Sequence, residues 1–292
     1  MFIEGSQISV AMATYNGSAY IIKQIDSIIS QDLQPCEIII VDDGSTDGTI
    51  EILKLMCLKY AFIKLYLNEI NKGYVSAFKL AISICNAQYI ALCDQDDIWE
   101  SNKLSFTFRQ LKMIEVKDLP CMVYTDLSLI SADEIKLHPS FWKYYSLNPH
   151  RTSFYSLLFG NVVTGCTALF NKSMAKELIL MPDSIQMHDH WMALIAYGFG
   201  RVKALSEQLV RYRSHTNSVT NKTRPNIVQS AISMLEKLNS DRYLHTYFQQ
   251  SEIFNQTYND KISNRIKYDM ERFLKLKTSN NFIKLLQYKI RT

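Results

Sequence analysis

Two kinds of glycine-rich phosphate loop are missing from this chain, which has nine glycines in 292 residues. Neither Gly-x-Gly-x-x-Gly nor Gly-x-x-x-x-Gly-Lys-Ser/Thr occurs. Both loops bind phosphate through glycine backbone and the first turn of a helix. A dinucleotide dehydrogenase and a P-loop enzyme therefore lose support. Any bound phosphate would have to be neutralised by a metal and by cationic side chains.

Paired cysteines and a secretion signal are also missing. The six cysteines are scattered, and none forms a Cys-x-x-Cys pair. This spacing argues against a structural zinc site and against a disulfide framework. The chain does not open with a basic segment followed by an apolar one, as a signal peptide does. We therefore expect buried thiols and a cytoplasmic location.

An uncharged stretch between Arg151 and Lys172 is about as long as a membrane span. It contains Gly160, Asn161 and Thr164, however, and its apolar residues fall in two short blocks. A helix, a polar loop and a strand are the better prediction.

The first half alternates strand-like and helix-like segments. Short β-prone runs alternate with segments whose apolar residues recur at helical spacing. Ser45 or Thr46 is a candidate cap for the second helix. Such alternation predicts an α/β protein with a mostly parallel sheet. The predicted strands are 8–13, 37–41, 63–67 and 89–93, and the helices between them are 19–30, 46–56 and 71–84.

Further strands are predicted over 121–125, 166–170, 201–205 and 209–212, with a helix over 187–197. Beyond Thr220 the pattern is helical, basic and aromatic. Residues 221–292 hold 13 Lys+Arg against 6 Asp+Glu, whereas residues 1–220 hold 19 against 22. This asymmetry predicts a domain over 1–220 and a separate C-terminal helical region over 221–292.

Three carboxylates follow the apolar run Tyr89–Cys93 directly, at Asp94, Asp96 and Asp97. Carboxylates this close raise one another's pKa unless a cation joins them. In open α/β sheets, ligands bind at the carboxyl ends of the strands. The cluster therefore predicts a divalent metal such as Mn²⁺ or Mg²⁺, together with phosphate oxygens.

A second acidic pair, Asp42 and Asp43, follows the predicted strand 37–41. Alone it would be read as turn chemistry, because Asp-Gly and Ser-Thr-Asp-Gly are turn sequences. Two acidic groups at neighbouring strand ends converge on one edge of the sheet, which favours a functional interpretation. One carboxylate there could accept hydrogen bonds from a base or a ribose.

Candidate groups for catalysis lie further along the chain. Asp189 sits at the start of a predicted helix and offers a general base, with Trp191 as an apolar wall for a sugar. The alternative is an Asp cap flanked by surface histidines. Arg213 would suit a diphosphate and His215 a metal, although a lone histidine is more often a surface residue.

Taken in order, these motifs resemble the nucleotide-sugar glycosyltransferases of family two, which have the GT-A fold. The resemblance spans about residues 7–220. It covers the opening strand and loop, the acidic strand end at Asp42 and Asp43, the segment 71–73, and an Asp-x-Asp metal motif over 94–96. It implies donor contacts at Ala13, Thr14, Tyr15, Asn16, Asp42, Asp43, Asn71, Lys72, Gly73, Asp94, Gln95 and Arg213.

The resemblance also implies the remaining site. It places Gly165 on the acceptor side and gives His188-Asp189 the position of the family's Glu-Asp pair, whose Asp is the base. Having His in place of Glu departs from the pattern. Acceptor contacts are then implied at Gly165, His188 and Trp191, and metal ligands at Asp94, Asp96 and His215. The Tyr-Arg-x-His segment and the Asp-Gln-Asp-Asp-Ile-Trp segment are most similar to bacterial rhamnosyltransferase-like members.

The implied fold is a Rossmann-like, mostly parallel sheet flanked by helices, with a C-terminal helical extension. The implied reaction is inverting transfer from a dTDP- or UDP-sugar to a saccharide or lipid-linked saccharide in bacterial surface polysaccharide synthesis. Residues 221–292 could pack as ordinary helices, dock on an anionic membrane, or bind nucleic acid; we expect no nucleic acid. The alternatives are a sugar-nucleotide pyrophosphorylase and a non-catalytic nucleotide-sugar binding or scaffold protein.

Overall fold

A computed structural model describes residues 7–214 and 241–278. The strands are β1 (Ile8–Thr14), β2 (Glu37–Asp42), β3 (Ile63–Leu67), β4 (Tyr89–Cys93), β5 (Ile98–Trp99), β6 (Cys121–Ile130), β7 (Lys136–His138), β8 (Leu169–Asn171) and β9 (Arg201–Arg213). The helices are α1 (Ile21–Ile29), α2 (Thr49–Lys59), α3 (Tyr74–Ile84), α4 (Lys103–Ile114), α5 (Phe141–Tyr144), α6 (Phe154–Leu157), α7 (Lys172–Leu178), α8 (His188–Phe199), α10 (Asp241–Tyr258) and α11 (Asn264–Leu274). Short 3-10 turns are η1 (Pro149–Arg151), η2 (Gly165–Thr167) and η3 (Lys275–Thr278).

The described strands form one sheet in the order β3-β2-β1-β4-β8-β6-β9-β5, with β7 beside β6. β1 pairs in parallel with β2 and β4, and β2 pairs in parallel with β3. β8 runs antiparallel to β4 and β6, and β5 runs antiparallel to β9. The predicted α/β class is confirmed. The parallel order belongs to the first four strands, and the rest of the sheet is mixed.

A hydrophobic core lies on each face of the sheet, as strand alternation requires. In β1, Val10 and Met12 point into the core that includes residues of α1, α2 and α4. Ala11 points to the opposite core, which includes residues of α3, α7 and α8. β2 is buried along its whole length, because helices cover both of its faces. Rigid strands therefore carry the polar residues at their ends.

Three local predictions differ from the structure. Ser45 and Thr46 do not cap α2, which begins at Thr49 after Gly48 with a φ of 94°. The predicted strand 166–170 is the turn η2 followed by β8. The two predicted closing strands are one strand, β9, whose pairing with β6 shifts register near Asp126.

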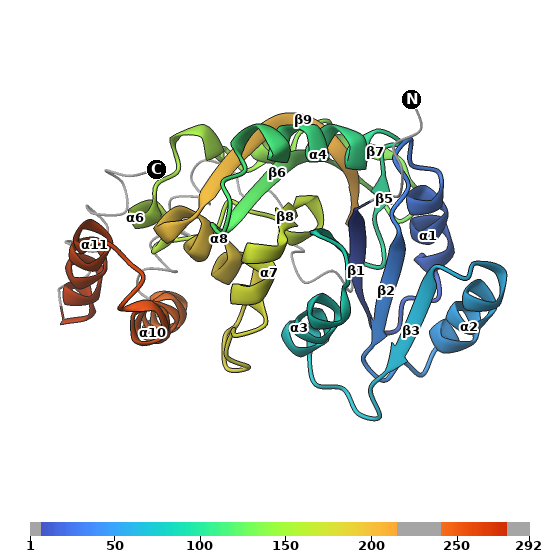
Figure 1. Cartoon of the computed structure of the whole chain (residues 1–292), viewed down its shortest axis with the longest axis horizontal. Coiled ribbons are helices and arrows are strands. Elements are labelled where there is room, and N and C mark those ends of the chain that lie inside the picture. Colours follow the sequence, from blue (N-terminus) through green and yellow to red (C-terminus); the bar gives the residue numbers. More distant parts are fainter. Residues whose placement is uncertain (1–6, 215–240, 279–292) are drawn as a thin grey trace.

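The C-terminal helices α10 and α11 lie at the end of the molecule opposite β3 and α2 (Figure 1). They share the core that contains α8. The Phe254 ring lies 5.3 Å from that of Trp191, and the Phe273 ring lies 4.8 Å from that of Phe159. Residues 241–278 thus pack as ordinary helices against the core that contains α8. None of the described helices is long and apolar enough to cross a membrane.

Candidate active site

Asp42 is buried at the end of β2 and ties two loops together. Its Oδ2 accepts hydrogen bonds from the hydroxyls of Thr14, at 2.7 Å, and Ser45, at 2.6 Å. Its Oδ1 accepts the Ser45 backbone N–H at 2.8 Å. The carboxylate has 0% exposure, so it does not face a donor as predicted. Thr14, also predicted to touch the donor, is buried and holds Asp42 instead.

Asp43 organises the start of α3. Its carboxylate accepts hydrogen bonds from the Asn68 amide at 2.7 Å, from the Lys72 backbone N–H at 3.0 Å, and from the Gly73 backbone N–H at 2.7 Å. The predicted segment 71–73 therefore lies against the predicted base contact. Asn71 and Lys72 are exposed beside it. This arrangement joins two segments that are far apart in the sequence.

The loop after β1 reaches across to the acidic cluster. The Gln95 Oε1 accepts the Tyr15 backbone N–H at 2.8 Å, and its amide donates to the Tyr15 carbonyl at 2.9 Å. A Cβ at Gly17 would lie 2.3 Å from that Oε1, so a larger residue there would displace the Gln95 amide. Asn16, with a φ of 49°, accepts the Thr46 N–H at 2.8 Å. Tyr15 and Asn16 stay exposed, whereas Ala13 is half-buried against the core.

The acidic cluster lies where β4 ends. Ligand atoms of Asp94, Asp97 and Cys166 all lie within 4.8 Å of one another. Asp97 is fully buried; its Oδ1 accepts the Arg213 N–H at 3.2 Å, and its Oδ2 has no hydrogen bond within the described residues. Such an unsatisfied buried oxygen is the state that a cation would relieve.

The pKa values in this cluster also show that its ionised carboxylates are unfavourable without a cation. Burial, followed by the charges of Asp96 and Asp189, raises the pKa of Asp94 to about 7. Burial, followed by the charges of Asp96 and Asp94, holds the pKa of Asp97 well above its usual range. These carboxylates fit a divalent cation, which would restore their ionised form.

A buried cation, Lys103, lies beneath the cluster and was not identified from the sequence. Its Nζ is 3.7 Å from the Trp99 ring centroid and has no hydrogen bond within the described ranges. Burial lowers the pKa of Lys103 to about 8, while attraction to Cys93, Cys166 and Asp97 opposes this shift. The signal was hidden, because Ser101-Asn102-Lys103 reads as a polar surface.

Asp189, the predicted base, lies in the first turn of α8. Its Oδ1 accepts the His190 backbone N–H at 2.7 Å. Burial raises the pKa of Asp189 to about 6. Hydrogen bonds from backbone N–H groups act in the opposite direction and limit this rise. Gly165 packs against it, since a Cβ there would lie 2.8 Å from His188 Nε2 and 3.5 Å from Asp189 Cβ. The structure therefore brings Gly165, Asp189 and Asp94 together.

His188 is buried between aromatic rings rather than exposed to an acceptor. It stacks on Phe78 at 4.3 Å and meets Tyr74 edge-on at 5.8 Å. Neither ring nitrogen has a hydrogen bond in the part of the chain that the structure describes. Burial lowers the pKa of His188 to about 4, so the ring is neutral at pH 7. It packs the base's helix in place.

Trp191 does not form the predicted wall of the acceptor site. Its indole is fully buried, against Phe254 at 5.3 Å and Tyr258 at 5.8 Å. The sequence could not show that α10 covers this face of α8. His190 was missed for the same reason: its Nε2 donates to the Leu157 carbonyl at 2.7 Å, and its Nδ1 accepts from Gln250 at 2.8 Å.

Arg213 does not present its guanidinium to a diphosphate in this arrangement. The side chain is 1% exposed and donates to the backbone carbonyls of Asp96, at 2.8 Å, and Ala132, at 2.6 Å. Its Nε and Nη1 groups therefore bind backbone carbonyls, and Nη2 lies 3.7 Å from Glu134. His215, the predicted metal ligand, lies outside the described residues.

This fold and its acidic strand end define a nucleotide-sugar glycosyltransferase of the GT-A class. The family model of glycosyl transferase family 2 matches residues 9–178, and the chain belongs to that family. The predicted family and enzyme class are confirmed. The chain is 26% identical over 295 residues to an uncharacterized glycosyltransferase of Haemophilus influenzae, covering 96% of this chain and 90% of the relative. It is 29% identical over 224 residues to the dTDP-rhamnosyl transferase RfbG of Shigella flexneri, covering 71% and 72%.

Solved structures share the fold at low sequence identity. A structure of S. aureus TarS residues 1–349 in complex with UDP superposes with a TM-score of 0.58 at 16% identity, covering 97% of this chain and 88% of that one. The mannosyltransferase PcManGT from Pyrobaculum calidifontis, in complex with GDP-Man and Mn²⁺, also gives 0.58 at 16% identity, covering 99% and 74%. These likenesses establish the fold.

Proposed function

We propose that this chain is a metal-dependent inverting glycosyltransferase that moves a sugar from a nucleotide diphosphate to an acceptor hydroxyl. One observation carries the proposal: Gly165 and Cys166 join Asp189 to Asp94. A Cβ at Gly165 would lie 3.5 Å from Asp189 Cβ, and the sulfur of the next residue, Cys166, lies within 4.8 Å of an Asp94 oxygen. A base and an acidic cation site are thus adjacent, although 95 positions separate them in the sequence. Tyr74 is affected by both groups, because burial and then the charges of Asp189 and Asp94 raise the pKa of its hydroxyl.

Asp189 would act as the general base. With a pKa of about 6 it is ionised at neutral pH and still basic enough to accept a proton. The acceptor oxygen attacks the anomeric carbon from the face opposite the nucleotide. As the new carbon–oxygen bond forms, the bond to the diphosphate breaks, and the hydroxyl proton passes to the Asp189 carboxylate.

Asp94 and Asp96 would hold the Mn²⁺ or Mg²⁺ ion, with His215 as a further candidate. The ion supplies positive charge that stabilises the departing diphosphate. Asp97 and Cys166 would add ligand atoms, because theirs lie within 4.8 Å of that of Asp94. A Mn²⁺ complex of PcManGT, which has the same fold, supports a divalent ion here.

The donor would lie along Asp43 and the segment 71–73, with Tyr15 and Asn16 at the edge. The name of RfbG supports a dTDP-rhamnose donor, and the UDP complex of TarS supports a uridine alternative. Both bases offer an N–H that an aspartate can bind. The proposed donor is therefore a dTDP- or UDP-sugar, with rhamnose as one candidate sugar.

The acceptor would reach Asp189 past the loop before α8. A cavity of about 390 Å³ lies between this loop and α10, lined by Gln186, Gln249, Gln250 and five further uncharged residues together with Glu252. Amide groups suit sugar hydroxyls. We place a saccharide or lipid-linked saccharide of bacterial surface polysaccharide synthesis on this side.

A lipid-linked acceptor would bring the enzyme to the inner face of the cell membrane. Residues 282–286, Phe-Ile-Lys-Leu-Leu, would suit an anionic membrane surface and lie outside the described residues. Flotation with anionic liposomes tests this idea on the full chain and on a chain ending at residue 278. Equal recovery of the two proteins would remove the membrane from the proposal.

The function is tested with a panel of nucleotide sugars. Thermal shifts with and without Mn²⁺ select the donor, because a ligand that binds the native state stabilises it. Transfer or hydrolysis of that donor should be lost on chelation, and Asp96→Ala should lower turnover by at least ~10²-fold with the fold intact. Chelation-resistant turnover would contradict the metal dependence.

The two alternatives make different predictions. A pyrophosphorylase would form a nucleotide sugar from a nucleoside triphosphate and a sugar phosphate, and it usually carries a glycine-rich basic loop near β1, where this chain has Thr14-Tyr15-Asn16-Gly17. A scaffold would bind the donor without turnover. A protein that only binds the donor would have no need of an ionisable base beside Asp94.

A further inference from the structure

Arg213, at the end of β9, contacts the acidic loop, the turn after β6 and the segment just before α1. Its Nε–H donates to the Asp96 carbonyl at 2.8 Å, and its backbone N–H donates to Asp97 Oδ1 at 3.2 Å. One residue thus holds two consecutive members of the acidic cluster, one through its side chain and one through its backbone.

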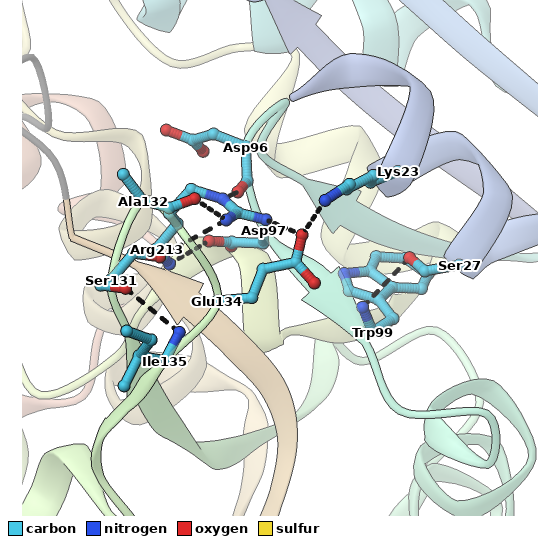
Figure 2. Close-up of polar contacts among 10 residues, drawn as sticks. All are labelled: Lys23, Ser27, Asp96, Asp97, Trp99, Ser131, Ala132, Glu134, Ile135 and Arg213. Carbon is cyan, nitrogen blue, oxygen red and sulfur yellow. Dashed lines mark hydrogen bonds and ion pairs between the residues drawn. The ribbon is translucent and has the colours of Figure 1, made fainter. Parts of the chain in front are cut away.

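The same guanidinium fixes the turn after β6. Its Nη1 donates to the Ala132 carbonyl at 2.6 Å and to the Ser131 carbonyl at 3.4 Å. Its Nη2 lies 3.7 Å from Glu134, which also pairs with Lys23 of α1 (Figure 2). The guanidinium carbon lies 4.8 Å from the Tyr20 ring centroid. Three segments besides β9 therefore meet at this one side chain.

Figure 2 shows that the backbone carbonyl and the side chain of Asp96 face different directions. The Asp96 carbonyl faces the guanidinium, while its carboxylate points away from Arg213. Fixing the carbonyl restricts the backbone from which the carboxylate projects. A metal ligand whose backbone is fixed in advance loses less freedom when the ion binds.

We propose that Arg213 is a positioning residue that sets Asp96 and Asp97 for the metal, and that it is not a ligand of the donor diphosphate. This inference rests on the proposed function. Only arginine suits the task, because its planar fork reaches carbonyls of two separate segments at once. Lysine would keep the charge and lose the fork.

The test is a Mn²⁺ titration of the full chain, with free Mn²⁺ followed by electron paramagnetic resonance, with and without saturating UDP. Arg213→Lys should raise the Mn²⁺ Kd by about 10- to 100-fold, the range seen when a partner of a metal ligand is lost. Arg211→Gln is the matched control on the same strand, because Arg211 pairs with Glu100 at 2.7 Å. Its Mn²⁺ Kd should stay at the wild-type value.

Opposite results would overturn the inference. If Arg213→Lys binds Mn²⁺ like the wild type but binds UDP more weakly, Arg213 contacts the donor directly. If Arg213→Lys does not melt cooperatively, Glu134→Gln decides: an Mn²⁺ Kd above that of Arg211→Gln supports the inference, and an equal Kd refutes it. A wild type that binds no Mn²⁺ would instead overturn the metal-dependent function, and this inference with it.

Discussion

The strand ends of β2 and β4 carry similar sequence patterns and handle their charges in opposite ways. Asp42 and Asp43 accept hydrogen bonds from hydroxyls, an amide and backbone N–H groups of their own chain. Burial and the charge of Asp96 raise the pKa values of both Asp94 and Asp97, and one Asp97 oxygen has no hydrogen bond among the described residues. An acidic strand end is therefore a scaffold where the chain satisfies it, and a cation site where the chain leaves it unsatisfied.

The largest expected effect concerns the base beside the unsatisfied strand end. Asp189→Asn keeps the shape and the acceptor for the His190 N–H, but it cannot take a proton. Turnover should fall by at least ~10²-fold while the melting temperature stays within a few degrees of the wild type. Single-turnover transfer measures this directly. Near-normal transfer by the purified variant would move the base elsewhere.

The pH dependence of the reaction sharpens the same point. Because the pKa of Asp189 is about 6, the base is protonated below that pH and inactive. We expect kcat/KM to fall about tenfold per pH unit below pH 6 and to level off above it. A pH profile at saturating Mn²⁺ tests this, and a flat profile between pH 5 and 7 would contradict the assignment.

The satisfied strand end should affect stability rather than chemistry. Asp42→Ala leaves two hydroxyls and one N–H without their acceptor in a buried site. The free energy of unfolding should fall by about 3 kcal/mol. Urea denaturation checks it, with Asp32→Ala as a surface control, since the exposed Asp32 carboxylate accepts one hydrogen bond among the described residues, from Ser105 at 2.7 Å. Full stability of Asp42→Ala would show that these bonds contribute little.

The unsatisfied strand end at β4 should make the stability of the metal-free protein fall as pH rises, whereas activity should rise with pH. This effect should be smaller than the preceding ones. The pKa values of Asp94 and Asp189 are raised on folding, so the native state binds more protons than the unfolded state between about pH 4 and pH 7. Stability contributed by these groups is present at low pH and is lost as pH rises through about 7. Metal-free protein in chelator should lose a few degrees of melting temperature across this range, whereas Asp94→Asn should lose less.

Much of the fold followed from the sequence, because strand and helix periods differ and the first four strands alternate with helices. Strands 63–67 and 89–93 were placed correctly, since both are short β-prone runs bounded by turn residues. The second half was harder. Strand β9 is half-exposed, so its pattern read as two strands, and the turn η2 is apolar enough to read as a strand.

The place of a residue in the fold was predictable where its own helix or strand decides it, and not where another segment covers it. Asp94 and Asp189 follow from a strand end and a helix start. Trp191 and Arg213 were assigned to substrates because exposed aromatics and arginines often bind them, yet both are buried by segments far away in the sequence. Lys103 was missed because the burial of a single lysine near the acidic cluster produces no periodic pattern in the sequence.

The most direct test compares the melting temperature with and without Mn²⁺ at pH 8 for the wild type, Asp94→Asn and Asp42→Asn. Mn²⁺ should raise the melting temperature of the wild type and of Asp42→Asn by the same amount, because only the β4 end requires a cation. Asp94→Asn should start higher without metal and gain little from Mn²⁺. An equal Mn²⁺ shift in Asp94→Asn, or a lost shift in Asp42→Asn alone, would contradict the assignment of the cation to the β4 strand end.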